Sequence, residues 1–110
     1  MNNPMIKEFA RDKGFCCFPT LRESLRKGET PIDWYKILAL CAPRPFMTWQ
    51  TTEDIWFPNH EYVAEADRRV RDVYRLYGAK DKLALAMDSG EHGFPENART
   101  LAYDFLAQHL

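Results

Sequence analysis

The amino-acid sequence predicts an α/β fold with two parallel strands, a long crossover helix between them and a helix at the C-terminus. Two short runs of aromatic, β-branched and aliphatic residues, at 45–52 and 83–87, are typical of strands. Between them, residues 60–77 repeat apolar side chains at three- and four-residue steps, as an amphipathic helix does. Because strands separated by such a helix form a βαβ unit, we expect a parallel pair with a right-handed crossover.

Before the first strand, the sequence predicts two short helices. Residues 21–27 can form one of them, inside an N-terminal segment, 1–32, that is otherwise irregular. The second should begin after Asp33, a residue type that caps helices. It should end at 42–45, because neither proline there can donate a backbone hydrogen bond. Arg44, between those prolines, could hold either a nearby carboxylate or the last carbonyl groups of this helix.

The elements after the first strand carry their own boundary signals. Asn59 can cap the long helix, and Gly78 stands where a helix commonly ends in a left-handed glycine. The second strand is almost continuously apolar, which predicts that both of its faces are covered. Pro95 suits the first turn of the last helix. The apolar stripe of that helix consists of Ala98, Leu101, Ala102, Phe105 and Leu106.

Size and composition indicate one domain, 1–110, and exclude several classes of function. The apolar content of 45% is that of a globular chain. A net charge of −1 gives no basis for a nucleic-acid or anionic-membrane partner. No apolar run is long enough to span a membrane, and the N-terminus lacks a signal-peptide core. As given, the chain is expected in the cytoplasm, whereas a missing N-terminal part would leave the location unknown.

The cysteines and tryptophans have simple interpretations. Cys16, Cys17 and Cys41 are odd in number, so the sequence implies no disulfide framework. No CxxC or HxxxH spacing occurs, and we expect neither a metal nor a cofactor. The three tryptophans, Trp34, Trp49 and Trp56, are expected to anchor packing, although Trp56 could instead line a pocket.

Charged side chains follow both strands. Glu53 and Asp54 come after the first strand, and Asp88, Glu91 and His92 follow the second. The carboxyl ends of parallel strands meet at one edge of a sheet, where ligands commonly bind. An aspartate that holds one imidazole nitrogen leaves the other free to accept a proton. The alternative is that these are ordinary loop residues, since Asp and Gly are frequent in turns.

Two segments resemble a known superfamily. "ALCAPRPFMTWQTTEDIWFP" and, further along, "GEHGFPENA" are similar to the C-terminal part of α/β-hydrolases, most of all the acetyl xylan esterase and dienelactone hydrolase-like branch. The resemblance covers roughly residues 33–110 and implies a partial α/β-hydrolase fold. It implies that Asp54 is the acid and His92 the base of a catalytic triad. One departure is that Gln50-Thr51 stands where the family has a glycine.

The nucleophile of that superfamily has no counterpart here. It belongs to a G-x-S-x-G turn between a strand and a helix, and the sequence contains no such motif. Ser24 lacks the flanking glycines, and Ser89 lies only three residues before His92. Cys16 and Cys17 precede the acid and the base, but "GFCCFP" lacks the second glycine and the flanking strand and helix.

Two hypotheses follow. In the first, the chain is the C-terminal fragment of a carboxylic ester hydrolase, with the acid and the histidine but no nucleophile, and is inactive alone. It would act on a small ester only when completed. In the second, the chain is a non-catalytic oligomerising or partner-binding module derived from an α/β-hydrolase. Since two parallel strands leave two unprotected edges, both hypotheses lead us to expect a homo-oligomer or a complementary hydrolase chain.

Overall fold

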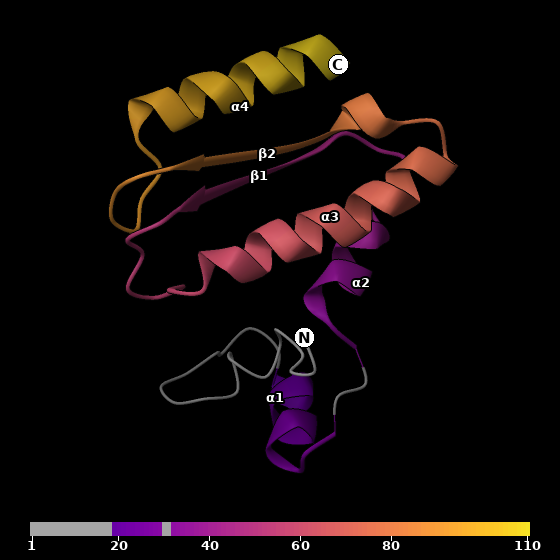
Figure 1. The fold of residues 1–110 in the computed structure, drawn as a ribbon, viewed down its shortest axis with the longest axis vertical. Coiled ribbons are helices and arrows are strands. Elements are labelled where there is room, and N and C mark those ends of the chain that lie inside the picture. Colours follow the sequence, from indigo (N-terminus) through magenta and orange to yellow (C-terminus); the bar gives the residue numbers. More distant parts are fainter. Residues whose placement is uncertain (1–18, 30–31) are drawn as a thin grey trace.

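The computed structural model describes residues 19–29 and 32–110, and it has the mixed α/β architecture that the sequence predicts. Two parallel strands lie between helices, as Figure 1 shows. The elements in chain order are α1 (Pro19–Arg26), α2 (Trp34–Ala39), β1 (Phe46–Thr51), α3 (His60–Leu76), the short 3-10 helix η2 (Lys80–Lys82), β2 (Leu83–Asp88) and α4 (Glu96–His109). The helix expected around 21–27 is thus confirmed, whereas η2 was not foreseen.

The register of the sheet brings the ends of the two strands level. Phe46 lies opposite Leu83 at the start of the pair, and Thr51 lies opposite Asp88 at its end. In Figure 1, α3 runs along one side of the sheet and α4 along the other. The chain therefore forms three layers, and the segments that follow both strands emerge at the same edge.

The core lies at the opposite end of the sheet from these segments. Its buried residues are Val70, Tyr74, Ala79 and Leu83, and partly buried residues of α2 and β1 pack against them. Tyr74 is fully buried, and its hydroxyl donates a hydrogen bond of 2.5 Å to the carbonyl oxygen of Arg44. Burial raises the pKa of this hydroxyl, so it remains a donor. These contacts hold α2 and α3 against the sheet at the end where the two strands begin.

Helix α2 has the boundaries that the sequence predicts. The Asp33 carboxylate accepts a hydrogen bond of 2.7 Å from the backbone N–H of Trp34. At the other end, the Arg44 guanidinium donates to the carbonyl oxygens of Leu40 and Cys41. Both satisfy groups that a helix end leaves without partners.

The prediction for the start of α3 is wrong in one detail. Asn59 occupies the cap position, but its side chain makes no capping hydrogen bond. Its backbone carbonyl instead accepts from the N–H of Tyr62, which closes the first turn. At the other end, Gly78 is left-handed (φ +67°), as predicted. The N–H groups of Gly78 and Ala79 bind the carbonyls of Arg75 and Tyr74, which is the Schellman pattern.

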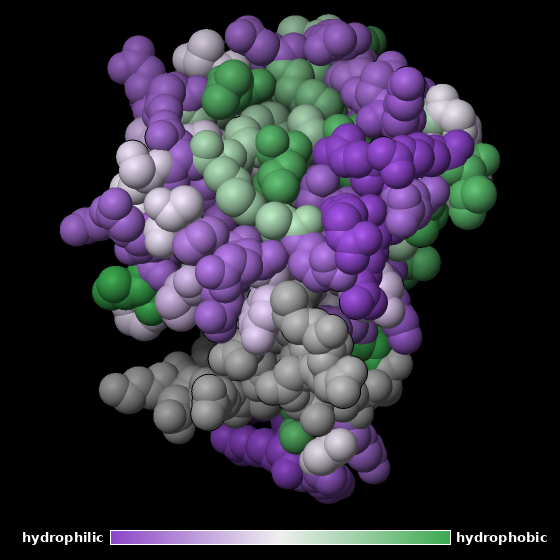
Figure 2. All heavy atoms as spheres, in the orientation of Figure 1, coloured by the Kyte–Doolittle hydropathy of each residue, from purple (hydrophilic) through white to green (hydrophobic). Residues whose placement is uncertain are grey.

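The cover over β2 and α4 is thinner than the sequence predicts. Of β2, only Leu83 is buried, and Met87 is exposed. Along α4, only Ala98 of the predicted stripe is buried, while Leu101 and Leu106 are each 46% exposed. In Figure 2, apolar side chains gather over α4 and the neighbouring strand. Although β2 is almost continuously apolar, its two faces are therefore not both covered by the described residues, contrary to the prediction.

None of the helices in the described part of the chain combines the length and apolar character that a membrane span requires.

Candidate active site

Backbone hydrogen bonds join the two segments that follow the strands. The N–H of Thr52 donates to the carbonyl of Asp88 at 3.0 Å, and the N–H of Glu53 donates to the carbonyl of Gly90 at 3.1 Å. These bonds extend the parallel pairing beyond the strands themselves. They place Asp54 one residue after the last donor and His92 two residues after the last acceptor.

The two carboxylate oxygens of Asp54 bind different partners. Oδ1 accepts hydrogen bonds from the backbone N–H groups of Trp56, at 2.8 Å, and Phe57, at 3.0 Å. An aspartate that binds its own chain two and three residues later creates a tight local turn. Oδ2 lies 2.7 Å from Nδ1 of His92. The Asp54 side chain is only 7% exposed, whereas its partner His92 is more than half exposed.

The surroundings of Asp54 favour its charged form. Burial alone would raise the pKa of the carboxyl group. The hydrogen bonds to His92 and to the backbone N–H groups of Trp56 and Phe57 outweigh burial, and the pKa is lowered. Asp54 is therefore an anion near neutral pH, which is the state that can hold and stabilise an imidazole.

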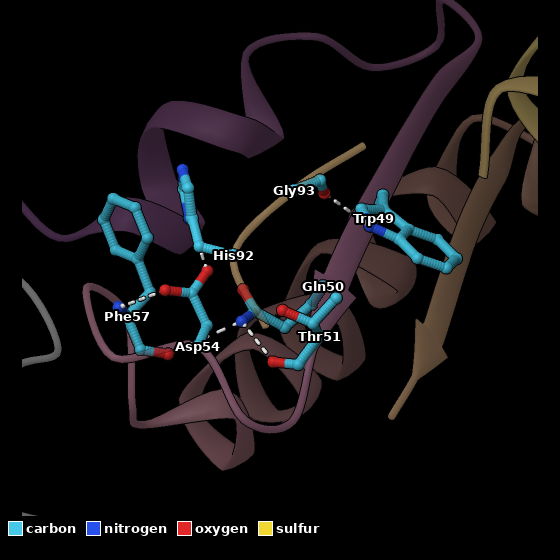
Figure 3. A pocket seen from close by; sticks show the side chains of 7 residues that line it. All are labelled: Trp49, Gln50, Thr51, Asp54, Phe57, His92 and Gly93. Carbon is cyan, nitrogen blue, oxygen red and sulfur yellow. Dashed lines mark hydrogen bonds and ion pairs between the residues drawn. The ribbon is translucent and has the colours of Figure 1, made fainter. Parts of the chain in front are cut away.

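His92 is bound on one side and open on the other. Its side chain is 53% exposed. Nδ1 faces Asp54, and the outer ring nitrogen, Nε2, points away from the carboxylate, as Figure 3 shows. The ring of Phe57 lies beside the imidazole, with centroids 5.9 Å apart. A carboxylate acceptor selects the tautomer that is protonated on Nδ1, which leaves Nε2 with a free lone pair.

These side chains border an open recess of about 280 Å³. Figure 3 shows the seven residues that line it: Trp49, Gln50, Thr51, Asp54, Phe57, His92 and Gly93. Two of them also bind the surrounding loops. The Trp49 indole N–H donates to the Gly93 carbonyl at 3.2 Å. The Gln50 amide donates to the carbonyls of Thr51, at 2.7 Å, and Phe57, at 3.5 Å.

Sequence reasoning assigned Trp49 to packing and gave Gln50 no role. The available signal was position, because both residues lie in the last half of β1, shortly before the Asp54 loop. Trp56 differs from its prediction, since it is 68% exposed and neither packs as an anchor nor lines the recess.

The other candidates after the strands do not join the recess. Asp88 instead accepts hydrogen bonds from the N–H of Ser89 and the side-chain amide of Asn97. Glu53 and Glu91 are exposed, and neither lines the recess. The structure therefore brings together Asp54 and His92 out of the five charged or titratable residues that follow the strands.

The described lining contains neither a serine nor a cysteine. Ser24 lies on α1, Ser89 follows β2 outside the recess, and Cys41 lies between α2 and β1. Cys16 and Cys17 fall outside the described residues. Across 19–29 and 32–110, no three or more His, Cys, Asp and Glu side chains gather as metal ligands would. The lining of the recess thus includes the His92 imidazole but no serine or cysteine side chain.

Comparison with known proteins identifies a partial relative. The chain is 39% identical, over 54 residues, to "Carbohydrate esterase MZ0003" from an unknown prokaryotic organism. The match covers 48% of this chain and 12% of the relative, so the chain spans only a small fraction of that protein's length. No family model and no solved structure matches the chain. The comparison supports a distant, partial similarity to an esterase.

Proposed function

We propose that this chain supplies the acid and the base of an ester hydrolase site, with Asp54 as the orienting acid and His92 as the general base. The observation that carries the proposal is the 2.7 Å contact between Asp54 Oδ2 and His92 Nδ1, with Nε2 pointing away from the carboxylate. The similarity to a carbohydrate esterase supports the same reaction class.

In the proposed reaction, a serine hydroxyl from polypeptide outside the described residues attacks the carbonyl carbon of a small ester. His92 Nε2 takes the hydroxyl proton as the new C–O bond forms, and then returns it to the departing alcohol as the ester bond breaks. Water hydrolyses the resulting acyl-enzyme by the same two proton transfers. Throughout, the Asp54 anion holds Nδ1–H and stabilises the imidazolium that forms.

A chimera with the partial relative tests this proposal. Residues 46–110, which contain both strands and both loops, would replace the corresponding segment of carbohydrate esterase MZ0003. The folded chimera should hydrolyse p-nitrophenyl acetate. His92→Gln should lower its kcat at least ~100-fold, because a positioned general base contributes about 10² to 10⁴.

His109→Gln is the matched control in that chimera. His109 ends α4 and contacts the ring of Phe105, away from the recess. We expect this variant to keep the activity of the parent chimera. A folded chimera in which His92→Gln is as active as His109→Gln would overturn the proposal.

A second function is favoured by the surface of the chain. Each described strand pairs with one other strand, so each keeps an unpaired outer edge in the described sheet. Large apolar side chains are exposed on α4 and in the Asp54 loop, including Leu101, Leu106, Ile55 and Trp56. We propose that the remainder of an esterase, on the same or another polypeptide, covers these surfaces. In the non-catalytic version of this proposal, the chain only binds such a partner.

A further inference from the structure

We propose that Trp49 is a positioning residue, whose indole N–H holds the His92 loop so that Nδ1 faces Asp54. The assignment rests on the proposed roles of Asp54 and His92 and extends them. Trp49 lies on β1, and its Nε1 donates to the carbonyl of Gly93, the residue that directly follows His92. The hydrogen bond joins residues 44 positions apart in the sequence.

The His92 loop is bound to the rest of the site on both sides of the histidine. On one side, the Gly90 carbonyl accepts from the backbone N–H of Glu53. On the other side, the Gly93 carbonyl accepts from Trp49. His92 lies between these two acceptors. Both donors belong to β1 and the segment that follows it, which also carries Asp54. The two hydrogen bonds therefore hold the loop of His92 at a fixed position relative to Asp54.

Side chains of α4 also bind this segment, since Asn97 donates to Asp88 and Arg99 donates to the Phe94 carbonyl, but neither bond connects the loop to β1. Gly90 adopts a positive φ of 130°, which most other residues avoid, and the residues from 91 to 97 are exposed. Glycines widen the range of backbone conformations that a loop can reach. Without the indole, the downstream side of the loop loses its bond to β1. The imidazole would then leave its 2.7 Å contact with Asp54 more readily.

The tautomer of His92 reports this contact directly. A free neutral imidazole in water prefers the proton on Nε2, whereas the Asp54 carboxylate selects the proton on Nδ1. Long-range ¹H–¹⁵N correlation spectra of the 110-residue chain, recorded in mildly alkaline buffer, distinguish the two forms. His92→Gln identifies the signals, and Asp54→Asn gives the reference for a lost carboxylate.

We expect the unsubstituted chain to hold the Nδ1–H form and Trp49→Phe to shift His92 toward the Nε2–H form. Phenylalanine keeps an aromatic ring on the strand but removes the donor. Trp34→Phe is the matched control, because it removes an indole from α2 and should leave the His92 tautomer unchanged. Circular dichroism measures what fraction of each variant is folded. A change in overall stability alone would alter that fraction but not the tautomer of His92 in the folded molecules.

The outcomes separate the two proposals. If the unsubstituted chain shows the Nδ1–H form and folded Trp49→Phe keeps it, the role of Trp49 is overturned and the acid–base pair stands. If the unsubstituted chain already shows the Nε2–H form, the pair and the role of Trp49 both fall. If Trp49→Phe does not fold, the role of Trp49 is tested by the hydrogen-exchange rates of the indole N–H groups in the unsubstituted chain. The bonded Trp49 indole must then exchange more slowly than that of the exposed Trp56, and equal rates overturn the role.

Discussion

At the scale of single residues, the candidate site depends on how the two oxygens of Asp54 are used. Oδ1 binds the backbone of its own loop, and Oδ2 binds His92. The same side chain therefore fixes the loop and orients the imidazole. Three hydrogen bonds outweigh the effect of burial on its pKa, so its charge is maintained without a cationic partner from Lys or Arg among the described residues.

Asp54→Asn should separate orientation from charge. Asparagine can still accept from Trp56 and Phe57 through its oxygen, so the free energy of unfolding should change by about 1 kcal/mol or less. Its amide would donate to Nδ1 and force the wrong tautomer. In the chimera with the esterase, kcat should therefore fall by roughly 10⁴, the scale of such changes in other triads. Steady-state kinetics and urea unfolding measure both effects.

Asp88→Asn is the control for that substitution, because Asp88 is an aspartate at the end of β2 that binds Ser89 and Asn97 outside the recess. It should leave kcat unchanged. An equal loss in both variants would show that the effect of Asp54→Asn is not specific to the histidine.

The stability of the chain should fall in acid because of Asp54. The pKa of its carboxyl in the folded chain lies below the ordinary value of 3.8. The folded state therefore binds this proton less readily than the unfolded state. The resulting stabilisation is complete above pH 3.8 and is lost as the pH falls through the folded pKa. Urea unfolding from pH 6 downward should show a steeper loss for the unsubstituted chain than for Asp54→Asn. Parallel curves would contradict this assignment.

At the scale of elements, the ends of the helices determine where the strands begin. The end of α3 shows this most clearly. Gly78 takes the left-handed conformation, and Ala79 turns back toward Tyr74 and enters the core beside Leu83. The start of β2, and with it the register that places His92, follows from this turn.

Gly78→Ala should destabilise the chain by about 1–2 kcal/mol, because the left-handed conformation is costly for a residue with a Cβ atom. The space around the added atom is open, so the effect should be conformational only. Gly93→Ala is the control, since Gly93 has no positive φ and its added Cβ would meet nothing closer than 4.0 Å. Urea unfolding should show the larger loss at Gly78. Equal losses would indicate that the positive φ is not the cause.

At the scale of the whole molecule, the described chain keeps surfaces that a folded protein usually covers. The core occupies the end of the sheet where the strands begin, while α4 exposes Leu101 and Leu106. The outer edges of β1 and β2 have no partner within the described residues. Exposed strand edges and apolar patches are typical of interfaces.

In solution, the 110-residue chain should therefore associate unless its partner is present. Analytical ultracentrifugation should detect species above the monomer mass of 12.9 kDa that increase with concentration. The double substitution Leu101→Lys and Leu106→Lys should reduce them, whereas Gln108→Lys, also on α4, should not. A monodisperse monomer that unfolds cooperatively would count against the need for a partner.

Catalysis by the chain alone should be negligible. The lining of the recess contains no serine or cysteine, so p-nitrophenyl acetate should be hydrolysed at close to the rate in buffer. His92→Ala should lower that rate no further. If the chain turns over the ester at a rate that His92→Ala abolishes, then the described residues are sufficient for catalysis and the proposed incompleteness is wrong.

Local patterns in the sequence predicted most of the elements. Helical spacing in 60–77, the two strand-like runs and the glycine at 78 each depend on neighbours along the chain, and each is confirmed. The placement of Asp54 and His92 after adjacent parallel strands also followed from these patterns. The side-chain hydrogen bond of Asn59 could not be predicted in this way, because a residue type that often caps helices does not always make the capping bond.

The sequence by itself therefore determined the order of elements and the edge of the sheet where the candidate site lies. Only the tertiary structure decided that Asp54 Oδ2 meets His92 Nδ1 at 2.7 Å, that Trp49 reaches Gly93, and that the apolar stripe of α4 is only partly covered. The physical reason is range. Helix and strand periodicity arises from contacts between near neighbours, whereas these hydrogen bonds join residues 38 and 44 positions apart and require one register of β1 against β2.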